Sequence, residues 1–251
     1  MRLRLLPAAL AVSITSLLGV SAAYAVVGGT PDGNDHPAVG GLVADQAYSD
    51  GTWIYCSGSL ISPTVFLTAA HCGEGGSDRV RVTFDSAYQD GDKTYTGTFH
   101  ADPAYPGPSG DPHDIAVVVL DKAVKGITPV ALPKAGSLDK LKSGVTVVGV
   151  GYGAYSVTND PGGHQYFYDD VRMEGTGSLN SVDKNWLRIS ENSAQGWGGG
   201  CFGDSGGPNF IGNVEVGTTI TGDSICRSTN TALRLDTPAS RAFLGQYVAL
   251  P

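Results

Sequence analysis

The chain of 251 residues carries 16 basic and 24 acidic residues, and its 36 glycines are spread among short apolar runs. This acidic balance argues against nucleic acid and anionic membranes as partners, because like charges repel, and it favours solubility. It leaves the fold open.

The first 25 residues have the pattern of a secretory signal peptide. A basic head with Arg2 and Arg4 precedes an apolar run over residues 5–20, and the segment ends in Ala23-Tyr24-Ala25. A membrane-spanning helix needs about 20 predominantly apolar residues, and this run is shorter and is interrupted by proline, serine and threonine. We therefore predict that residues 1–25 are removed on export, which leaves a secreted chain of 226 residues with a formal charge of −10.

The remainder of the chain has the pattern of an all-β protein. Gly, Pro, Asn and Asp separate short apolar or β-branched runs roughly every 8–15 residues, as in a β-barrel or β-sandwich. The length suits one large all-β domain or two small ones. The expected strands include Ser59–Ile61, Val80–Phe84, Thr94–Phe99, Ile115–Leu120, Val145–Val150 and Val214–Ile220.

A glycine-rich segment in the middle of the chain resembles a dinucleotide-binding fingerprint. Residues 149–154 match G-x-G-x-x-A and follow a strand-like run. That fingerprint requires a helix to begin immediately. Residues 155–163 read YSVTNDPGG, which predicts a loop, so we interpret the match as accidental and expect these glycines in turns.

One helix is expected, near the C-terminus. Thr237 can cap it and Pro238 suits its first turn. The apolar residues of its predicted face recur at i and i+4: Phe243, Leu244, Tyr247 and Val248. A helix that closes the end of a β-domain is the simplest interpretation.

The four cysteines predict two disulfides. An even number of cysteines in an exported chain is typical of disulfides, and the sequence alone allows three pairings. The chain has no C-x-x-C and no histidine pair with ligand spacing, so no metal site is expected. The cysteines are Cys56, Cys72, Cys201 and Cys226.

The segment CFGDSGGP, residues 201–208, contains a candidate nucleophile, Ser205. A serine hydroxyl needs a base to take its proton and donors to stabilise the oxyanion, and flanking glycines let backbone N–H groups approach a carbonyl. G-x-S-x-G also fits the α/β-hydrolases, but that fold places its histidine after its serine. The last histidine here is His164, so the base must lie upstream.

His71 is the preferred base. The candidates are His36, His71, His100, His113 and His164. His71 stands in LTAAHC, behind small residues and before a cysteine that can hold its backbone, whereas the others lie in loops or at the end of a polar run. Asp114 opens the apolar run DIAVVVL, where a carboxylate needs a partner because an unpaired buried charge is very costly.

Together these residues resemble the trypsin/chymotrypsin-like serine proteases, and two disulfides suggest a compact bacterial-type member. Four motifs occur in the order found in that family: VVGGT at 26–30, LTAAHC at 67–72, DIAVVVL at 114–120 and GDSGGP at 203–208. Subtilisin-like enzymes order their triad as aspartate, histidine, serine. They would need Asp32 or Asp35 and a helix-rich scaffold, which this sequence does not offer.

The resemblance implies an all-β fold of two antiparallel six-stranded β-barrels with a C-terminal α-helix and an active site between the barrels. The first barrel, residues 26–137, would supply His71 and Asp114, and the second, residues 138–251 with the helix, would supply Ser205. The backbone N–H groups of Gly203 and Ser205 would form the oxyanion hole. No metal or organic cofactor is implied.

The same resemblance implies the disulfides Cys56–Cys72 and Cys201–Cys226. It also implies a secreted, monomeric serine endopeptidase that acts on protein or peptide substrates through an acyl-enzyme intermediate. The alternative is a catalytically inactive homologue that serves as a binding protein. We favour the enzyme because the triad and the glycines on both sides of the serine are intact.

The junction between leader and VVGGT bears on activation. In this family, cleavage frees an apolar N-terminus that pairs with the aspartate just before the catalytic serine, here the Val26 ammonium with the Asp204 carboxylate. We therefore expect signal peptidase to cut after Ala25, so that export and activation are one event. The alternative is a cut after Ala22 or Ala23, followed by trimming.

The substrate pocket is expected to include Gly199, Gly200, Thr221 and Asp223. Trypsin-like members carry an aspartate six residues before the catalytic serine, where this chain has Gly199, so this position contributes no charge. If Asp223 lines the pocket, it can pair with Lys or Arg. If it points to solvent, the uncharged floor accepts apolar or medium-sized residues, which is the outcome we favour from sequence.

Overall fold

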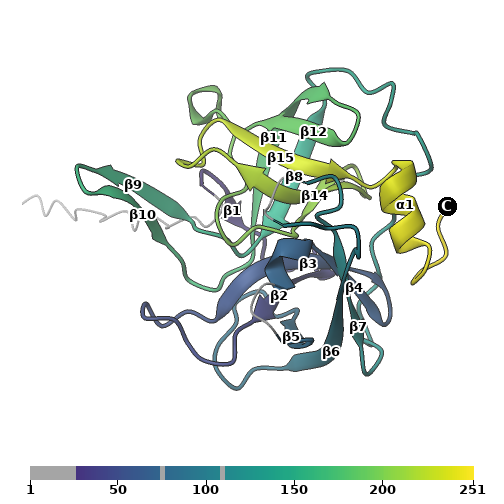
Figure 1. Cartoon of the computed structure of the whole chain (residues 1–251). Helices are drawn as coiled ribbons and strands as arrows, with labels where there is room; N and C mark the ends of the chain where they lie inside the picture. Colours follow the sequence, from purple (N-terminus) through teal and green to yellow (C-terminus); the bar gives the residue numbers. More distant parts are fainter. Residues whose placement is uncertain (1–26, 74–76, 108–110) are drawn as a thin grey trace, which may run out of the picture.

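The computed structural model describes residues 27–73, 77–107 and 111–251 (Figure 1). The predicted leader, the cleavage site and Val26 lie outside the described residues. Two β-barrels stack against each other, with the first half of the chain in one and the second half in the other (Figure 1).

The first barrel is closed by six antiparallel strands in the order β2-β3-β4-β7-β6-β5. Its strands are β2 (Val39–Val43), β3 (Ile54–Ser62), β4 (Val65–Thr68), β5 (Arg79–Thr83), β6 (Thr94–Ala101) and β7 (Ala116–Leu120). Closure leaves no unpaired edge, and inward-facing side chains fill the interior. The buried core includes Leu42, Leu60, Phe66, Val82 and Val118.

The second barrel also has six antiparallel strands. Its strands are β8 (Thr146–Gly151), β11 (Met173–Val182), β12 (Trp186–Ser190), β13 (Pro208–Ile211), β14 (Val214–Gly222) and β15 (Thr229–Arg234). Strand β8 pairs with both β11 and β13, which closes the ring, and the short β1 (Thr30–Pro31) adds to β11 outside it. The prediction of two six-stranded antiparallel barrels is confirmed.

Each strand expected from the sequence overlaps a strand of the structure, but the loop predicted over residues 155–163 is wrong. Strands β9 (Ser156–Asp160) and β10 (Gly163–Phe167) form a hairpin that projects from the barrels (Figure 1). The turn residues lie only at its tip, whereas Val157 at its base is buried beside the Cys201–Cys226 disulfide. No helix begins after Gly149–Ala154 in this part of the described chain, as expected.

The predicted C-terminal helix is present as α1 (Pro238–Leu244) and lies against the side of the barrels (Figure 1). The Thr237 hydroxyl accepts the Ser240 N–H at 3.2 Å, as an N-cap residue does. The helix ends earlier than its apolar pattern, so Tyr247 and Val248 follow it and pack on the first-barrel core. Two short 3₁₀ helices complete the described elements: η1 (Ala70–Gly73) and η2 (Ser193–Gln195).

A buried carboxyl group connects the two barrels. Glu215 of β14 is fully buried, and its Oε2 accepts a hydrogen bond from the Ser59 hydroxyl of β3 at 2.5 Å. The Thr218 hydroxyl gives a longer bond of 3.5 Å to Oε1. Burial raises the pKa of Glu215 to about 8, because desolvation penalises the charged form.

We expect the Glu215→Gln variant to have a flatter pH dependence of stability than the parent. The unfolded chain releases the Glu215 proton near pH 4.5, whereas the folded chain keeps it to about pH 8. The folded state therefore binds more protons in this window, and this group lowers stability, by on the order of a few kcal/mol, as pH rises through it. Thermal unfolding between pH 5 and 8.5 measures how steeply stability changes with pH in Glu215→Gln and in its parent, both in a Ser205→Ala background to prevent autolysis. Equal slopes would contradict the assignment.

Candidate active site

His71 and Asp114 form a hydrogen-bonded pair in the first barrel. His71 lies in η1, directly after β4, and the Cys56–Cys72 disulfide ties this turn to β3. Asp114 precedes β7, and its carboxylate is fully buried. One carboxylate oxygen accepts the His71 backbone N–H at 3.0 Å, and the other lies 2.8 Å from His71 Nδ1. The aspartate therefore fixes both the backbone and the ring of the histidine.

The loop that carries Ser205 is held by both barrels. The Ser205 carbonyl accepts the N–H of Ser57 in β3 at 2.8 Å, and the Gly206 N–H donates to the Thr219 carbonyl in β14 at 2.7 Å. Gly206 has a φ of 83°, and a Cβ there would lie 2.1 Å from the Thr68 hydroxyl oxygen. Only glycine suits this position, since it adopts positive φ freely and has no side chain to clash.

Two backbone N–H groups beside Ser205 are available to a substrate. Gly203 has a φ of 95°, and its carbonyl accepts the Ser57 hydroxyl at 2.9 Å. Within the described residues, the N–H groups of Gly203 and Ser205 have no protein acceptor. Donors of this kind bind the oxygen of a polarised carbonyl.

His71, Gly203 and Ser205 line one cavity of about 580 Å³. His71 is partly exposed, so its ring is accessible from this cavity. In the described part of the chain no direct hydrogen bond joins the Ser205 hydroxyl to His71, and catalytic hydrogen bonds of this type often tighten only when substrate binds. The cavity thus brings together the Ser205 side chain, the hydrogen-bonded His71–Asp114 pair and two backbone N–H groups without a protein acceptor.

Asp204 is buried behind the Ser205 loop. Its Oδ1 accepts the Gly153 N–H and its Oδ2 the Cys201 N–H, each at 2.8 Å. A Cβ on Gly151 or Gly153 would lie 2.2 or 2.3 Å from its carboxylate oxygens. The expectation that these glycines lie in turns is wrong for Gly149 and Gly151, which belong to β8; Gly151 and Gly153 instead make room for the Asp204 carboxylate. Burial raises the pKa of Asp204 to about 6.

The described chain begins beside this loop. Val27 forms an antiparallel bridge with Gly199, whose N–H donates to the Val27 carbonyl at 3.3 Å. Val27 also packs against the cluster that includes Cys201.

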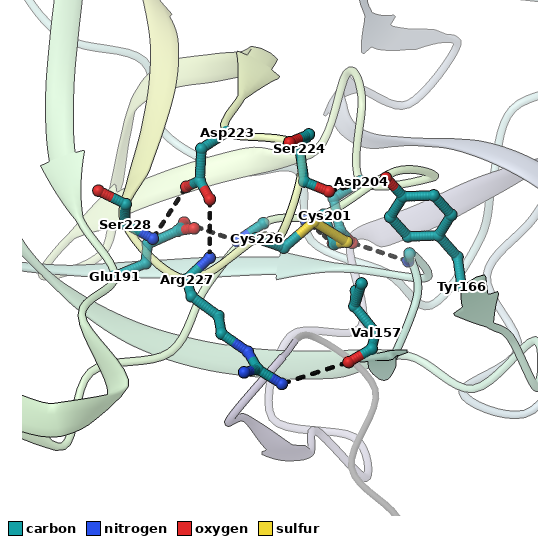
Figure 2. The surroundings of a disulfide bond; sticks show 12 residues. Val157, Tyr166, Glu191, Cys201, Asp204, Asp223, Ser224, Cys226, Arg227 and Ser228 are labelled. Carbon is teal, nitrogen blue, oxygen red and sulfur yellow. Dashed lines mark hydrogen bonds between the residues drawn. A yellow bond between two sulfur atoms is a disulfide. The ribbon is translucent and has the colours of Figure 1, made fainter. Parts of the chain in front are cut away.

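The predicted pocket residues do not all reach the cavity. Gly200, Thr221 and Asp223 line it, but Gly199 does not, which corrects the sequence-based assignment. The Asp223 carboxylate is bound to its own loop: Oδ1 accepts the N–H of Ser228 at 2.8 Å and Oδ2 that of Arg227 at 3.2 Å (Figure 2). Oδ1 also accepts the N–H of Thr229 at 2.8 Å. Burial raises the pKa of Asp223, but these bonds outweigh it and hold the pKa below its usual value.

Sequence reasoning missed Glu191, a buried acid whose carboxyl group lies against Gly199 and Gly200. It belongs to no motif and stands 14 residues before Ser205, just after β12. The sequence feature that could have indicated it is the Gly199-Gly200 pair, because two residues without side chains leave space for a side chain from another element.

The disulfides are Cys56–Cys72 and Cys201–Cys226, the pairing that the resemblance implied. The second joins the Ser205 loop to the segment after β14 and closes a loop of 25 residues (Figure 2). In the chain-entropy model, a disulfide that closes a loop of this length adds roughly 3 kcal/mol to the free energy of unfolding. The Cys201–Cys226 disulfide therefore restrains the wall of the cavity that these two cysteines line.

Two side-chain clusters in the described residues have ligand-like spacing, but neither fits a metal. Cys56, His71 and Cys72 form one, and both of its sulfurs are in the disulfide. Asp32, His36 and Glu174 form the other, where His36 Nδ1 lies 2.5 Å from Asp32 Oδ1. The second Asp32 oxygen accepts the Nε–H of the buried Arg172 at 2.7 Å and the backbone N–H of His36 at 3.2 Å, so both of its lone pairs are used.

Comparison with known proteins agrees with this architecture. The chain is 32% identical over 187 residues to a chymotrypsin from Phaedon cochleariae, a match that covers 69% of this chain and 65% of that protein. It is 32% identical over 175 residues to glucanase inhibitor protein 2 of Phytophthora infestans, covering 64% of each chain. Glucanase inhibitor protein 3 of Phytophthora sojae is 30% identical over 164 residues, or 61% of this chain and 60% of that protein. The chain thus spans less than two thirds of the length of each relative.

A solved structure, human heparin binding protein, has the same fold, with a TM-score of 0.68, 17% identity and coverage of 89% of this chain and 96% of that one. None of the helices in the described ranges is long and apolar enough to span a membrane. The family model described as Trypsin matches residues 26–242. The chain therefore belongs to the trypsin family.

Proposed function

We propose that this chain is a secreted serine endopeptidase that hydrolyses peptide bonds of protein substrates through His71, Asp114 and Ser205. The observation that carries the proposal is the His71–Asp114 pair, which opens onto the same cavity as Ser205 and the free N–H groups beside it. These are the components that acyl transfer from a peptide bond requires.

In the proposed mechanism, His71 takes the proton of the Ser205 hydroxyl while Ser205 Oγ attacks the scissile carbonyl carbon. The oxyanion binds the N–H groups of Gly203 and Ser205. His71 then passes the proton to the leaving amine, which leaves an ester on Ser205. Water, deprotonated by His71, hydrolyses this ester and restores the serine. Asp114 keeps the imidazole in one tautomer and stabilises its cation throughout.

The wider organisation is also part of the proposal. Residues 1–25 act as a signal peptide, residues 26–137 form the first barrel unit, and residues 138–251 form the second with α1. The mature protein is an extracellular monomer without a metal or organic cofactor, and its two disulfides suit a compact member of the bacterial type. A formal charge of −10 supports protein or peptide substrates over nucleic acid or membranes.

Activation is proposed to depend on a new N-terminus at Val26. The bridge between Val27 and Gly199 places the start of the described chain beside the segment that leads into the Ser205 loop. Asp204 has two N–H partners but no cation among the described residues. The Val26 ammonium, once freed by cleavage after Ala25, supplies the positive charge that a buried carboxylate requires.

A second candidate is a catalytically inactive binding protein, which is favoured by two relatives named as glucanase inhibitor proteins. The two functions separate in one assay. Processed protein is incubated with fluorescently labelled casein, with and without an irreversible serine-directed inhibitor. We expect hydrolysis that the inhibitor abolishes. A folded, processed protein that releases no peptides would favour the binding protein.

A further inference from the structure

A buried carboxyl group lies behind Gly200, one of the residues that line the cavity. Glu191 is 2% exposed, and its Oε1 accepts the N–H of Gly200, a cavity-lining residue, at 2.6 Å. Figure 2 shows Glu191 in the surroundings of the Cys201–Cys226 disulfide, which also borders the cavity. Its Oε2 has no hydrogen-bond partner, and it is the one buried side-chain polar atom in this condition among the described residues. Such an atom is costly unless a ligand or another group satisfies it.

Gly199 makes room for this carboxyl group. A Cβ on residue 199 would lie 1.9 Å from Glu191 Oε1 and 2.2 Å from Glu191 Cδ. No side chain at 199 can coexist with Glu191 in this position. The carboxyl group of Glu191 therefore occupies the space that a side chain on residue 199 would take. The chain has an acid at this place although residue 199 contributes none.

Gly200 connects this acid to the cavity of about 580 Å³, because it lines the cavity and donates its N–H to Glu191, whereas Glu191 itself does not line the cavity. Tyr48 and Phe202 line it and are about half exposed, at 48% and 50%, whereas Asn230, which also lines it, is 2% exposed. Asn230 Nδ2 is bound to Asn209 Oδ1 and Thr219 Oγ1, at 3.2 Å each, and does not reach Glu191. Asn230 and Glu191 are both shielded from water, and a charge on Glu191 is therefore little screened.

The charges around Glu191 favour a cationic ligand. The groups that act on its carboxyl electrostatically are Asp204 and Asp223, both acidic. The nearest basic side chain along the Asp223 loop, Arg227, donates to the Val157 carbonyl at 3.2 Å and makes no ion pair in the described structure (Figure 2). A ligand that brings both a positive charge and N–H donors satisfies the free oxygen and offsets this concentration of negative charge.

We propose that Glu191 determines substrate specificity and that the processed enzyme prefers Lys or Arg on the N-terminal side of the cleaved bond. The inference rests on the proposed endopeptidase function and replaces the apolar preference expected from sequence. Asp223 also lines the cavity, but its carboxylate is bound to three backbone N–H groups of its own loop. Glu191 retains an unused acceptor, so it is the acid that binds the substrate cation.

Binding of a cation at Glu191 is expected to release a proton. Burial raises the pKa of Glu191 well above its usual range, and the neighbouring Asp204 and Asp223 carboxylates act in the same direction. A bound cation lowers this pKa, because an opposite charge favours the carboxylate. Cationic ligands therefore displace a proton and bind more tightly as pH rises, until Glu191 is ionised without them.

The test compares peptide amides that differ only in having arginine or its uncharged analogue citrulline before the cleaved bond. Active sites of the processed enzyme are first counted by titration. We expect wild type to favour arginine in kcat/KM by roughly tenfold to a hundredfold, the range of charge-assisted hydrogen bonds. Glu191→Gln should bring the ratio close to one, and Glu191→Asp should keep part of it. Asp90→Asn, an exposed change of equal charge, is the matched control and should keep the full ratio.

Three results would overturn the inference. These are a wild-type ratio near one, an undiminished ratio in Glu191→Gln, and a ratio that Asp223→Asn lowers more than Glu191→Gln does. If wild type has no titratable active sites, the proposed function fails, and calorimetry of benzamidine binding to the folded protein still tests the pocket. Binding that strengthens with pH and releases a proton would support Glu191. Binding no stronger than that of uncharged benzyl alcohol would refute it.

Discussion

Replacing Ser205 with alanine is expected to lower kcat on peptide substrates by roughly 10⁶-fold, since the acyl-enzyme cannot form without the hydroxyl. The fold should persist, because Ser205 is held in the structure through its backbone carbonyl and its neighbours, not through its hydroxyl. The measurement is single-turnover and steady-state hydrolysis of a fluorogenic peptide by processed protein, with circular dichroism as the check on folding.

Two further variants sharpen this prediction. Ser137→Ala, which changes an exposed serine in a turn, should retain full activity. His71→Ala should lose nearly as much as Ser205→Ala, and the double variant should lose little more, because residues that act as one unit are strongly non-additive. Retention of more than a few per cent of activity in Ser205→Ala would contradict the assignment of the nucleophile.

The second large effect concerns Asp204. Asp204→Asn should leave secretion intact but reduce activity by roughly 10²- to 5 × 10³-fold, since breaking a buried ion pair costs about 3–5 kcal/mol. The asparagine keeps the size of the side chain but cannot hold the Val26 ammonium, so the loop with Gly203 loses its anchor. The measurement combines kcat/KM, active-site titration and N-terminal sequencing of the secreted protein.

The same experiment tests the timing of activation. If cleavage after Ala25 activates the enzyme, fully active protein begins at Val26, and an alanine inserted between Ala25 and Val26 should leave a poorly active product. Asp90→Asn again controls for loss of one negative charge on the surface. Full activity in Asp204→Asn, or in enzyme that begins at another residue, would contradict this mechanism.

The sequence predicted the fold well because the periodic pattern and the turn residues agree with the barrels along nearly the whole chain. Its error over residues 155–163 has a local cause. Glycine, proline, asparagine and aspartate mark the tip of the β9–β10 hairpin, and they obscured the β-branched pair Val157-Thr158 beside them. The helix ended at Leu244 although its apolar pattern continued, because Tyr247 and Val248 reach the same core from the segment that follows.

The candidate site was predictable where chemistry requires a fixed residue type in a fixed order. His71, Asp114 and Ser205 each stand in a motif, and the buried state of Asp114 follows from its position beside an apolar strand. Glu191 was not predictable in this way, because its role comes from two elements that meet only in three dimensions. The absence of a Cβ at Gly199 is local information, but which side chain fills that space depends on how β12 packs against the pocket.

The most direct test of the proposed triad is covalent labelling of the processed protein with a fluorophosphonate, followed by mass spectrometry of its peptides. Only an activated serine beside oxyanion donors reacts rapidly with this reagent. We predict one adduct per folded molecule, on Ser205, that disappears in His71→Ala. No labelling of a folded protein that begins at Val26, or an adduct on a different serine, would contradict the assignment of this chain as a serine endopeptidase.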